Sequence, residues 1–181
     1  LITSHSPHIV NRSDFKSIRC FLKCDGAVEI KDFYRDLNEM YSNENSKKNE
    51  DEKSNFRFLQ QYLTVHSSEL FFAEKIIFIE GITEKLLLPI FIKNMDEKNI
   101  SNENYNCIGS QNISILEVGA NSKAFRHFID FLKIKTLIIT DIDTTSKKVN
   151  GKNTKYPAEE VKKGTHTSNV SIKYFLGAPN I

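Results

Sequence analysis

The residues of this chain best suited to chemistry are four carboxylates that follow two short apolar stretches. Glu80 and Glu84 lie in "KIIFIEGITEKLLLP", and Asp141 and Asp143 lie in "TLIITDID". Carboxylates at the end of a buried strand are unfavourable unless a cation accompanies them. No histidine cluster or thiolate pair accompanies them, so the set consists of hard oxygen ligands that suit Mg²⁺ or Mn²⁺. A divalent metal held in this way typically serves phosphoryl chemistry.

The sequence around these carboxylates alternates between strand and helix patterns. Apolar runs at 76–79, 112–118 and 136–140 predict three strands, and helical patterns over 83–95 and 122–132 separate them. This alternation predicts an α/β fold with a central parallel sheet that helices cover on both faces. Ligands of such sheets bind beyond the carboxyl ends of the strands, which is where the four carboxylates fall.

The local spacing also favours a shared site. Glu84 is four residues after Glu80, so both side chains face one side of a helix that begins at Gly81, where the glycine frees the backbone to turn. In the D-x-D segment, the side chains of Asp141 and Asp143 point to the same side. A single acidic residue after a strand is more simply a helix cap or a solvated turn residue, but the joint pattern favours metal binding. Receiver-like and haloacid-dehalogenase-like domains are disfavoured, because they need a nucleophilic aspartate at the position of Glu80.

The chain before residue 75 and after residue 143 is less regular. Residues 1–10 predict a strand end followed by a polar turn, and 15–33 predict a hairpin that turns at Asp25-Gly26. Residues 42–55 contain no apolar side chain, which predicts a solvated linker or insertion. Pro89 is expected to kink its helix or to begin a later one. Residues 144–167 are polar and irregular, and a helix capped by Ser168 or Asn169 is expected to follow.

Composition limits the protein class without fixing it. The net charge of the 181 residues is +2, so no strongly basic field indicates nucleic acid, although bound metal ions can supply positive charge at a phosphate site. The three cysteines, Cys20, Cys24 and Cys107, lack the second pair of a zinc motif and suit reduced thiols in a cytoplasmic protein. No apolar run is long enough to cross a membrane, and no signal peptide pattern is present. Because the chain starts at Leu1, we expect a fragment of a longer protein.

Three longer blocks resemble one family. "ELFFAEKIIFIEGITEKLLLP", "ILEVGANSKAFRHFIDFLKIKTLIITDID" and "THTSNVSIKYFL" are similar to the OLD (overcoming lysogenization defect) family of ATP-dependent endonucleases, of which the Gabija nuclease subunit is a relative. Members join an ABC-type ATPase to a C-terminal Toprim (Rossmann-like) nuclease domain. The resemblance implies the end of an ATPase domain at 1–40, a polar linker at 41–55, a connecting helix at 56–74, and a Toprim domain at 75–181 that is incomplete at its C-terminus.

The resemblance also implies roles for individual residues. Glu80 corresponds to the Toprim glutamate, a metal ligand or general base, and Glu84 to an additional ligand. Asp141 and Asp143 correspond to the D-x-D metal ligands. A later lysine is expected to stabilise the transition state, and Lys173 is the first candidate, ahead of Lys147 and Lys148.

Further residues are placed by the same resemblance. Ser168 and Asn169 are expected near a second metal, and Glu117 could approach the site, although it is more simply a strand-edge residue. His5, in "SHSPHI", corresponds to the histidine that senses the nucleotide in the ATPase. The chain contains no G-x-x-x-x-G-K-[ST] phosphate loop, so we expect no ATP hydrolysis by this chain alone.

These observations predict a Mg²⁺- or Mn²⁺-dependent endonuclease that nicks or cleaves DNA, with ATP as a cofactor of the full-length protein. The resemblance further implies a homodimer or higher oligomer, a helicase-like or other defence-system partner, and a role against phage. The alternative is a catalytically inactive Toprim module that binds DNA or a partner. A primase or topoisomerase is disfavoured, because no zinc ribbon or catalytic tyrosine context is visible.

Overall fold

A three-stranded parallel sheet forms the centre of the computed structural model, which describes residues 2–24, 26–42, 49–65, 68–146 and 155–177. The strands are β3 (Lys75–Ile79), β4 (Ile113–Glu117) and β5 (Lys135–Ile138), in the order β4-β3-β5. Four of the five residues of the central strand are buried, as expected for a strand covered on both faces. The predicted α/β fold with a parallel sheet is confirmed.

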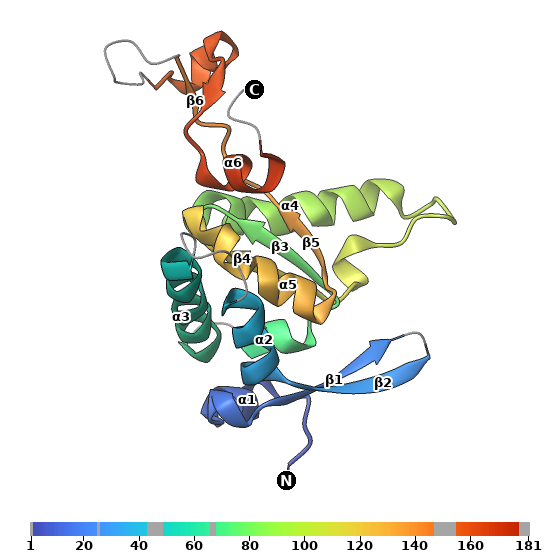
Figure 1. The fold of residues 1–181 in the computed structure, drawn as a ribbon. Helices are drawn as coiled ribbons and strands as arrows, with labels where there is room; N and C mark the ends of the chain where they lie inside the picture. The colour runs from blue at the N-terminus through green and yellow to red at the C-terminus, as the bar shows by residue number, and fades with distance from the viewer. Residues whose placement is uncertain (1, 25, 43–48, 66–67, 147–154, 178–181) are drawn as a thin grey trace.

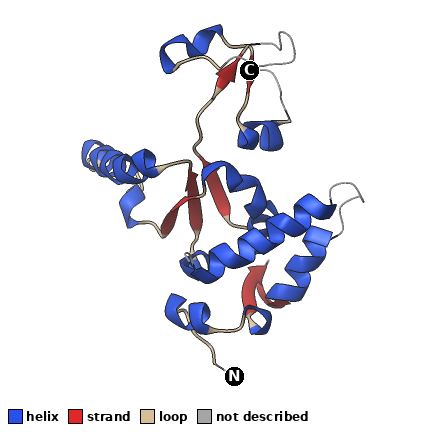
Figure 2. Cartoon of the chain, turned by 90° about the vertical axis from the view of Figure 1, so that its left-hand side faces the viewer, coloured by secondary structure: helices blue, strands red, loops and turns tan. Residues whose placement is uncertain are grey.

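Helices lie on both faces of this sheet. Helix α4 (Ile82–Asn99) joins β3 to β4 on one face, and α5 (Arg126–Leu132) joins β4 to β5 on the other face (Figures 1 and 2). The first connection runs from β3 to β4, and the second runs from β4 back past β3 to β5. The two connections move across the sheet in opposite directions, so right-handed crossovers place their helices on opposite faces. Helix α4 continues through Pro89 instead of ending there. The predicted helix over 122–132 instead begins as the 3₁₀ helix η4 (Gly119–Phe125), which leads into α5.

The N-terminal part begins with a helix. Helix α1 (Pro7–Arg12) occupies the stretch for which the sequence predicted a strand end and a turn. Its proline is in the first turn, where the missing N–H has no helical acceptor to lose. The short 3₁₀ helix η1 (Phe15–Ser17) follows.

The predicted hairpin is confirmed. Strands β1 (Arg19–Cys24) and β2 (Ala27–Asp32) are antiparallel, with Cys24 opposite Ala27. The turn between them contains Gly26 at φ 83°, a left-handed conformation that glycine adopts without strain, while Asp25 lies outside the described residues. Helix α2 (Phe33–Ser42) follows the hairpin directly.

The predicted polar linker is wrong over residues 49–55. These residues form the first turns of helix α3 (Asn49–Val65), whereas 43–48 lie outside the described part of the chain. Glu52 and Asn55 are buried, and the Asn55 amide donates a 3.3 Å hydrogen bond to the Glu52 carboxylate. The same carboxylate lies 3.8 Å from Nε2 of His127, on α5. Tertiary partners therefore stabilise polar residues in a helix that composition alone does not predict.

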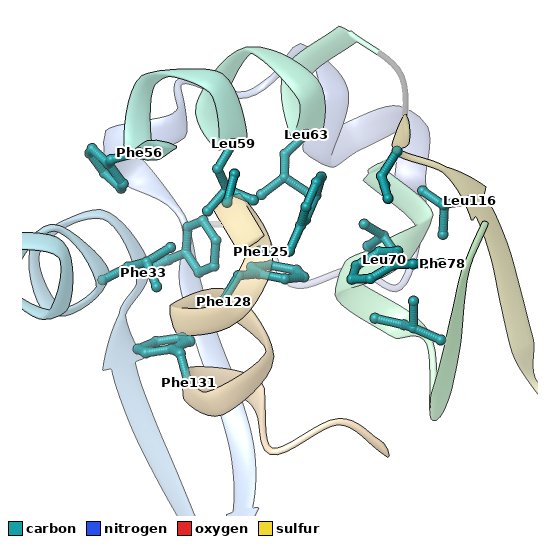
Figure 3. Packing of buried hydrophobic residues seen from close by; sticks show 14 of the residues in the cluster. Phe33, Phe56, Leu59, Leu63, Leu70, Phe78, Leu116, Phe125, Phe128 and Phe131 are labelled. Atoms are coloured by element: carbon teal, nitrogen blue, oxygen red, sulfur yellow. The ribbon is translucent and has the colours of Figure 1, made fainter. Parts of the chain in front are cut away.

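One hydrophobic core extends from the N-terminal part into the sheet layer. Phe33, at the start of α2, packs against rings of η2 (Ser68–Phe72) and α5, as Figure 3 shows for Phe128 and Phe131. The segments expected as an ATPase end and a Toprim domain thus share a single core. Its buried members are Phe15, Phe33, Leu37, Tyr41, Phe56, Leu59, Leu63, Leu70, Ala73, Ile76, Phe78, Leu116, Val118, Ala124, Phe125, Phe128 and Phe131.

The C-terminal segment extends from the carboxyl end of the sheet (Figure 1). It contains a two-residue ribbon of β6 (Thr144–Thr145) and β7 (His166–Thr167), the 3₁₀ helix η5 (Ala158–Lys163), and helix α6 (Val170–Leu176). A hydrogen bond of 2.6 Å between the buried hydroxyls of Ser122 and Ser171 fixes α6 against η4. The remaining element, η3 (Ile108–Ser110), precedes β4. Within the described residues, no helix is both long and apolar enough to span a bilayer.

Candidate active site

Glu80 joins three segments at the carboxyl edge of the sheet. It directly follows β3, and its Oε2 atom accepts hydrogen bonds from the Thr140 hydroxyl at 2.5 Å and the Asp141 amide at 3.0 Å. The amide nitrogen of Asn169 donates a third hydrogen bond, at 3.3 Å. Thr140 and Asp141 follow β5, and Asn169 caps α6. The carboxylate is therefore oriented by the neighbouring strand end and by the last helix.

These hydrogen bonds keep Glu80 ionised. Partial burial raises the pKa of its carboxyl. The hydrogen bonds from Thr140, the Asp141 amide and Asn169 lower this pKa, as does the charge of Lys155, and together they outweigh the effect of burial. The net pKa lies below that of an ordinary glutamate. Glu80 is thus an oriented, ionised base at neutral pH.

Asp141 has the opposite electrostatic environment. Its pKa is raised, first by partial burial and then by the negative charges of Glu80, Glu84 and Asp143. The other three predicted carboxylates are therefore close enough to Asp141 to disfavour its negative charge. A site with this excess of negative charge attracts a cation.

At Glu84 the carboxylate is hydrogen-bonded, and at Asp143 the backbone carbonyl is. The Glu84 carboxylate accepts a 3.1 Å hydrogen bond from the Gly81 amide at the start of α4. Asp143 has φ 47°, an uncommon conformation for a residue with a side chain, and its carbonyl accepts hydrogen bonds from the amide and hydroxyl of Ser168 at 2.9 and 3.3 Å. Such strained conformations cluster at functional sites. Ser168 and Asn169 thus contact Asp143 and Glu80, and their predicted place near a second metal stays a prediction.

A lysine that sequence reasoning missed lies at this site. Nζ of Lys155 is 3.8 Å from the Asp143 carboxylate, and a β-bridge to Thr145 fixes the backbone of Lys155. No spacing rule singles out this lysine in a Lys-rich segment; only the folding of β6 selects it. Lys147 and Lys148 lie outside the described residues. Lys173 is exposed on α6 and forms no ion pair with a described carboxylate, so its role stays a prediction.

His5 lies away from the carboxylates. It is exposed, and its ring lies 5.7 Å from that of Phe72, in η2 ahead of the amino end of β3. Figure 1 shows the N-terminus at the end of the molecule opposite α6. Its predicted role as a nucleotide sensor stays a prediction. Glu117 ends β4, next to β3, and lines a hollow together with Glu80.

The donor chemistry of the site suits a hard divalent cation. Glu80, Glu84, Asp141 and Asp143 offer only oxygen atoms, and the second oxygen of Glu80, Oε1, accepts no hydrogen bond from a described residue. Among the described residues, however, no three acidic, histidine or cysteine side chains are arranged closely enough to form a finished metal cage. A cation would therefore have to draw the mutually repelling carboxylates together.

Comparison with known proteins shows which family this fold and site resemble. Residues 71–143 match the family model described as the TOPRIM domain of overcoming lysogenization defect protein-like proteins. The match extends from η2 to Asp143 and includes all four carboxylates. This stretch of the chain is therefore similar to the OLD-like TOPRIM family.

The chain is also similar to a named relative. It is 30% identical over 181 residues to the endonuclease GajA of Bacillus cereus strain HuB5-5, and the alignment covers 97% of this chain. It covers 24% of GajA, so the chain spans about a quarter of the length of this relative. No solved structure shows a significant match.

Asn169 should contribute to stability in two separable ways. Its Oδ1 accepts a 3.1 Å hydrogen bond from the Ile172 amide, which caps α6, and its Nδ2 binds Glu80. Replacing a cap by alanine costs about 0.5–2 kcal/mol, so Asn169→Ala should lower the free energy of unfolding by about that amount at neutral pH. The measurement is urea denaturation at several pH values.

Asn169→Ser separates the two roles, because serine retains a cap acceptor but has no amide to donate to Glu80. A carboxyl with a lowered pKa stabilises the fold above its ordinary pKa, and this stabilisation is lost as pH falls through the lowered pKa. Both variants should therefore show a weaker dependence of stability on pH in that acidic window. Equal acid sensitivity in the wild type and both variants would contradict the proposed support of Glu80.

Proposed function

We propose that this chain carries the catalytic site of a metal-dependent endonuclease that cleaves phosphodiester bonds of DNA. The observation that supports it most directly is the group of Glu80, Glu84, Asp141 and Asp143 at the carboxyl edge of an OLD-like TOPRIM sheet. The similarity to a protein named as an endonuclease supports the same activity.

In this proposal the four carboxylates hold Mg²⁺ or Mn²⁺. A bound divalent metal neutralises phosphate charge and makes its water more acidic. Glu80 is ionised and oriented by Thr140 and Asn169, so it is suited to accept the proton of the attacking water. A lysine then stabilises the charge that develops on the phosphate. Lys173 is proposed from the resemblance, and Lys155 is the cation that lies beside Asp143.

The context of the reaction is proposed from the family alone. Coupling to an ABC-type ATPase, with ATP in the full-length protein and His5 as its sensor, follows the architecture of OLD proteins. Assembly as a homodimer or higher oligomer, a helicase-like or other defence-system partner, a cytoplasmic location and action against phage belong to the same proposal.

Metal removal tests the proposed chemistry directly. The full-length protein should nick or cut supercoiled plasmid in Mg²⁺ or Mn²⁺, and excess chelator should abolish this activity until metal is restored. Glu80→Gln should reduce the rate by about 10²–10⁴-fold, because glutamine keeps the hydrogen-bonded oxygen but cannot act as a base. Gel electrophoresis of the plasmid measures the rate.

Glu74→Gln is the matched control for this variant. Glu74 is exposed and precedes β3, so the same change is made at the other end of the same strand. It should leave the cleavage rate unchanged. Undiminished cleavage in chelator, or equal rates for Glu80→Gln and Glu74→Gln, would refute the proposal.

The second candidate is an inactive TOPRIM module that binds DNA or a partner. It is favoured by the lack of a finished three-ligand cage among the described residues and by the position of Lys155, which partly neutralises Asp143. Calorimetric titration with Mn²⁺ separates the candidates. Binding that disappears in Asp141→Ala supports the nuclease, and no binding at millimolar metal supports the module.

A further inference from the structure

A hollow of about 680 Å³ opens beside Glu80. Glu84, Asp141 and Asp143 are not among its lining residues. Helix α3 forms one wall with Phe58, Gln61 and Tyr62. The end of β4 and the start of η4 form the other wall, with Glu117, Val118, Gly119 and Asn121. This volume is within the range of pockets that bind small organic ligands, about 300–1,000 Å³.

The wall formed by α3 presents two fixed aromatic rings. Phe58 and Tyr62 are four residues apart and so lie on one face of the helix, with their ring centroids 5.9 Å apart. Both rings pack edge-to-face on the buried Phe125, at 6.1 and 5.1 Å. The Tyr62 hydroxyl donates a 2.8 Å hydrogen bond to the Glu117 carbonyl. The rings are half-buried, so they form a platform that is ordered before any ligand arrives.

The polar side chains of the pocket favour a neutral ligand that carries hydrogen-bond donors. Within the described part of the chain, the side chains of Gln61, Glu117 and Asn121 form no hydrogen bond or ion pair, so all three are available to a ligand. The carboxylates of Glu80 and Glu117 repel a phosphate group from the same space. A carboxylate accepts a hydrogen bond from the exocyclic amino group of a base, and aromatic rings stack on bases of any sequence.

We propose that this pocket holds one unstacked nucleobase of the DNA strand that is cut. The proposal rests on the function proposed above and extends it to the form of the substrate. Glu80 lines the pocket and also contacts Asp141, so a base in the pocket and a phosphate at the carboxylates would both adjoin this residue. The base and the phosphate of one nucleotide are joined by a single sugar, so they can occupy two such neighbouring positions.

This arrangement favours DNA in which one base is already free of its stack. A base inside a duplex must leave the helix to enter the pocket, and the unstacking is least unfavourable at a mismatch or in a single strand. Glu117 should further favour a base with an exocyclic amino group, such as cytosine, over thymine.

Three duplexes of one sequence test the proposal on the full-length protein, with Ca²⁺ in place of Mg²⁺ to prevent cleavage. The first is fully paired, the second has one mispaired cytosine, and the third has an abasic nucleotide at that position. Measured by fluorescence anisotropy, the mispaired duplex should bind about tenfold tighter than the abasic one, as expected for one base stacked on aromatic rings. If the protein instead recognises only the local flexibility of the DNA, the abasic duplex should bind as tightly as the mispaired one or more tightly. That result would overturn the proposal.

Variants locate the effect in the pocket. Phe58→Ala should abolish the difference between the mispaired and abasic duplexes, whereas Phe21→Ala, at an exposed position of the hairpin, should retain it. A fourth duplex carries a mispaired thymine at the same position. Glu117→Ala changes an exposed residue and should remove the preference for mispaired cytosine over this thymine even if Phe58→Ala is unstable. A preference that survives in both pocket variants contradicts the assignment.

The binding measurement is independent of cleavage. If the protein prefers the mispaired duplex but never cuts plasmid, the base pocket is supported and the nuclease proposal fails. If it cuts plasmid but binds the mispaired and abasic duplexes equally, the nuclease proposal is supported and the base pocket fails. Failure to bind any of the three duplexes overturns the pocket.

Discussion

Replacing Asp141 by asparagine should reduce DNA cleavage at least about 100-fold, because a metal ligand supports several kcal/mol of transition-state stabilisation. Asparagine retains the size of the side chain and the backbone amide that binds Glu80. The loss of activity would therefore reflect the missing charge. Plasmid nicking in Mg²⁺ and in Mn²⁺ measures it.

The same substitution should stabilise the metal-free protein. Burial and the charges of Glu80, Glu84 and Asp143 raise the pKa of Asp141 above its ordinary value. A carboxyl with a raised pKa destabilises the fold once it ionises, so the wild type loses stability as pH rises from the ordinary to the raised pKa. The variant has no such charge and should not show this loss. Because Asp141 is exposed, solvent screening keeps the gain small.

Thermal unfolding in chelator, followed across this pH range, measures the effect on stability. Asp51→Asn is the matched control, because Asp51 is exposed at the start of α3, away from the carboxylate group. Asp51→Asn should cleave DNA at the wild-type rate and should not show the gain in stability that is expected for Asp141→Asn. If Asp141→Asn were less stable than the wild type in chelator, Asp141 would have a structural role instead of the proposed one.

The sheet and its acidic edge could be predicted because their signals are local. Buried parallel strands are short apolar runs, and their carboxyl ends meet at one edge of the sheet. Glu80 and Asp141 directly follow such runs, so sequence alone brings them together. The hairpin turn, and a cap of the last helix at Ser168 or Asn169, were predictable for the same reason, since each depends on a few adjacent residues.

Features that depend on distant partners could not be predicted in this way. Glu52 lies in the first turn of α3, among polar residues, and its carboxylate contacts Asn55 and His127. Lys155 reaches Asp143 through the β-bridge to Thr145, which no residue pattern indicates. The pocket beside Glu80 likewise arises only when α3 packs against the end of β4. Local propensity is a weak guide wherever tertiary contacts decide.

Phe33→Ala should be among the most destabilising single substitutions in the chain. Phe33 is fully buried, and its ring meets those of Phe15, Phe71, Phe131 and Phe128 at 5.0, 4.7, 5.6 and 6.1 Å. Truncating a buried phenylalanine to alanine removes its apolar contacts and leaves a cavity, which costs about 3–5 kcal/mol.

The expected measurement is urea denaturation monitored by circular dichroism. Because Phe33 joins the N-terminal hairpin and α2 to α5 beside the sheet, the whole chain should unfold in one transition at a lower urea concentration. Phe21→Ala is the matched control, since Phe21 is 60% exposed on the same hairpin, and its loss should cost less than about 1 kcal/mol. Two separate transitions, with only the first shifted by Phe33→Ala, would show that the N-terminal part and the TOPRIM sheet fold independently.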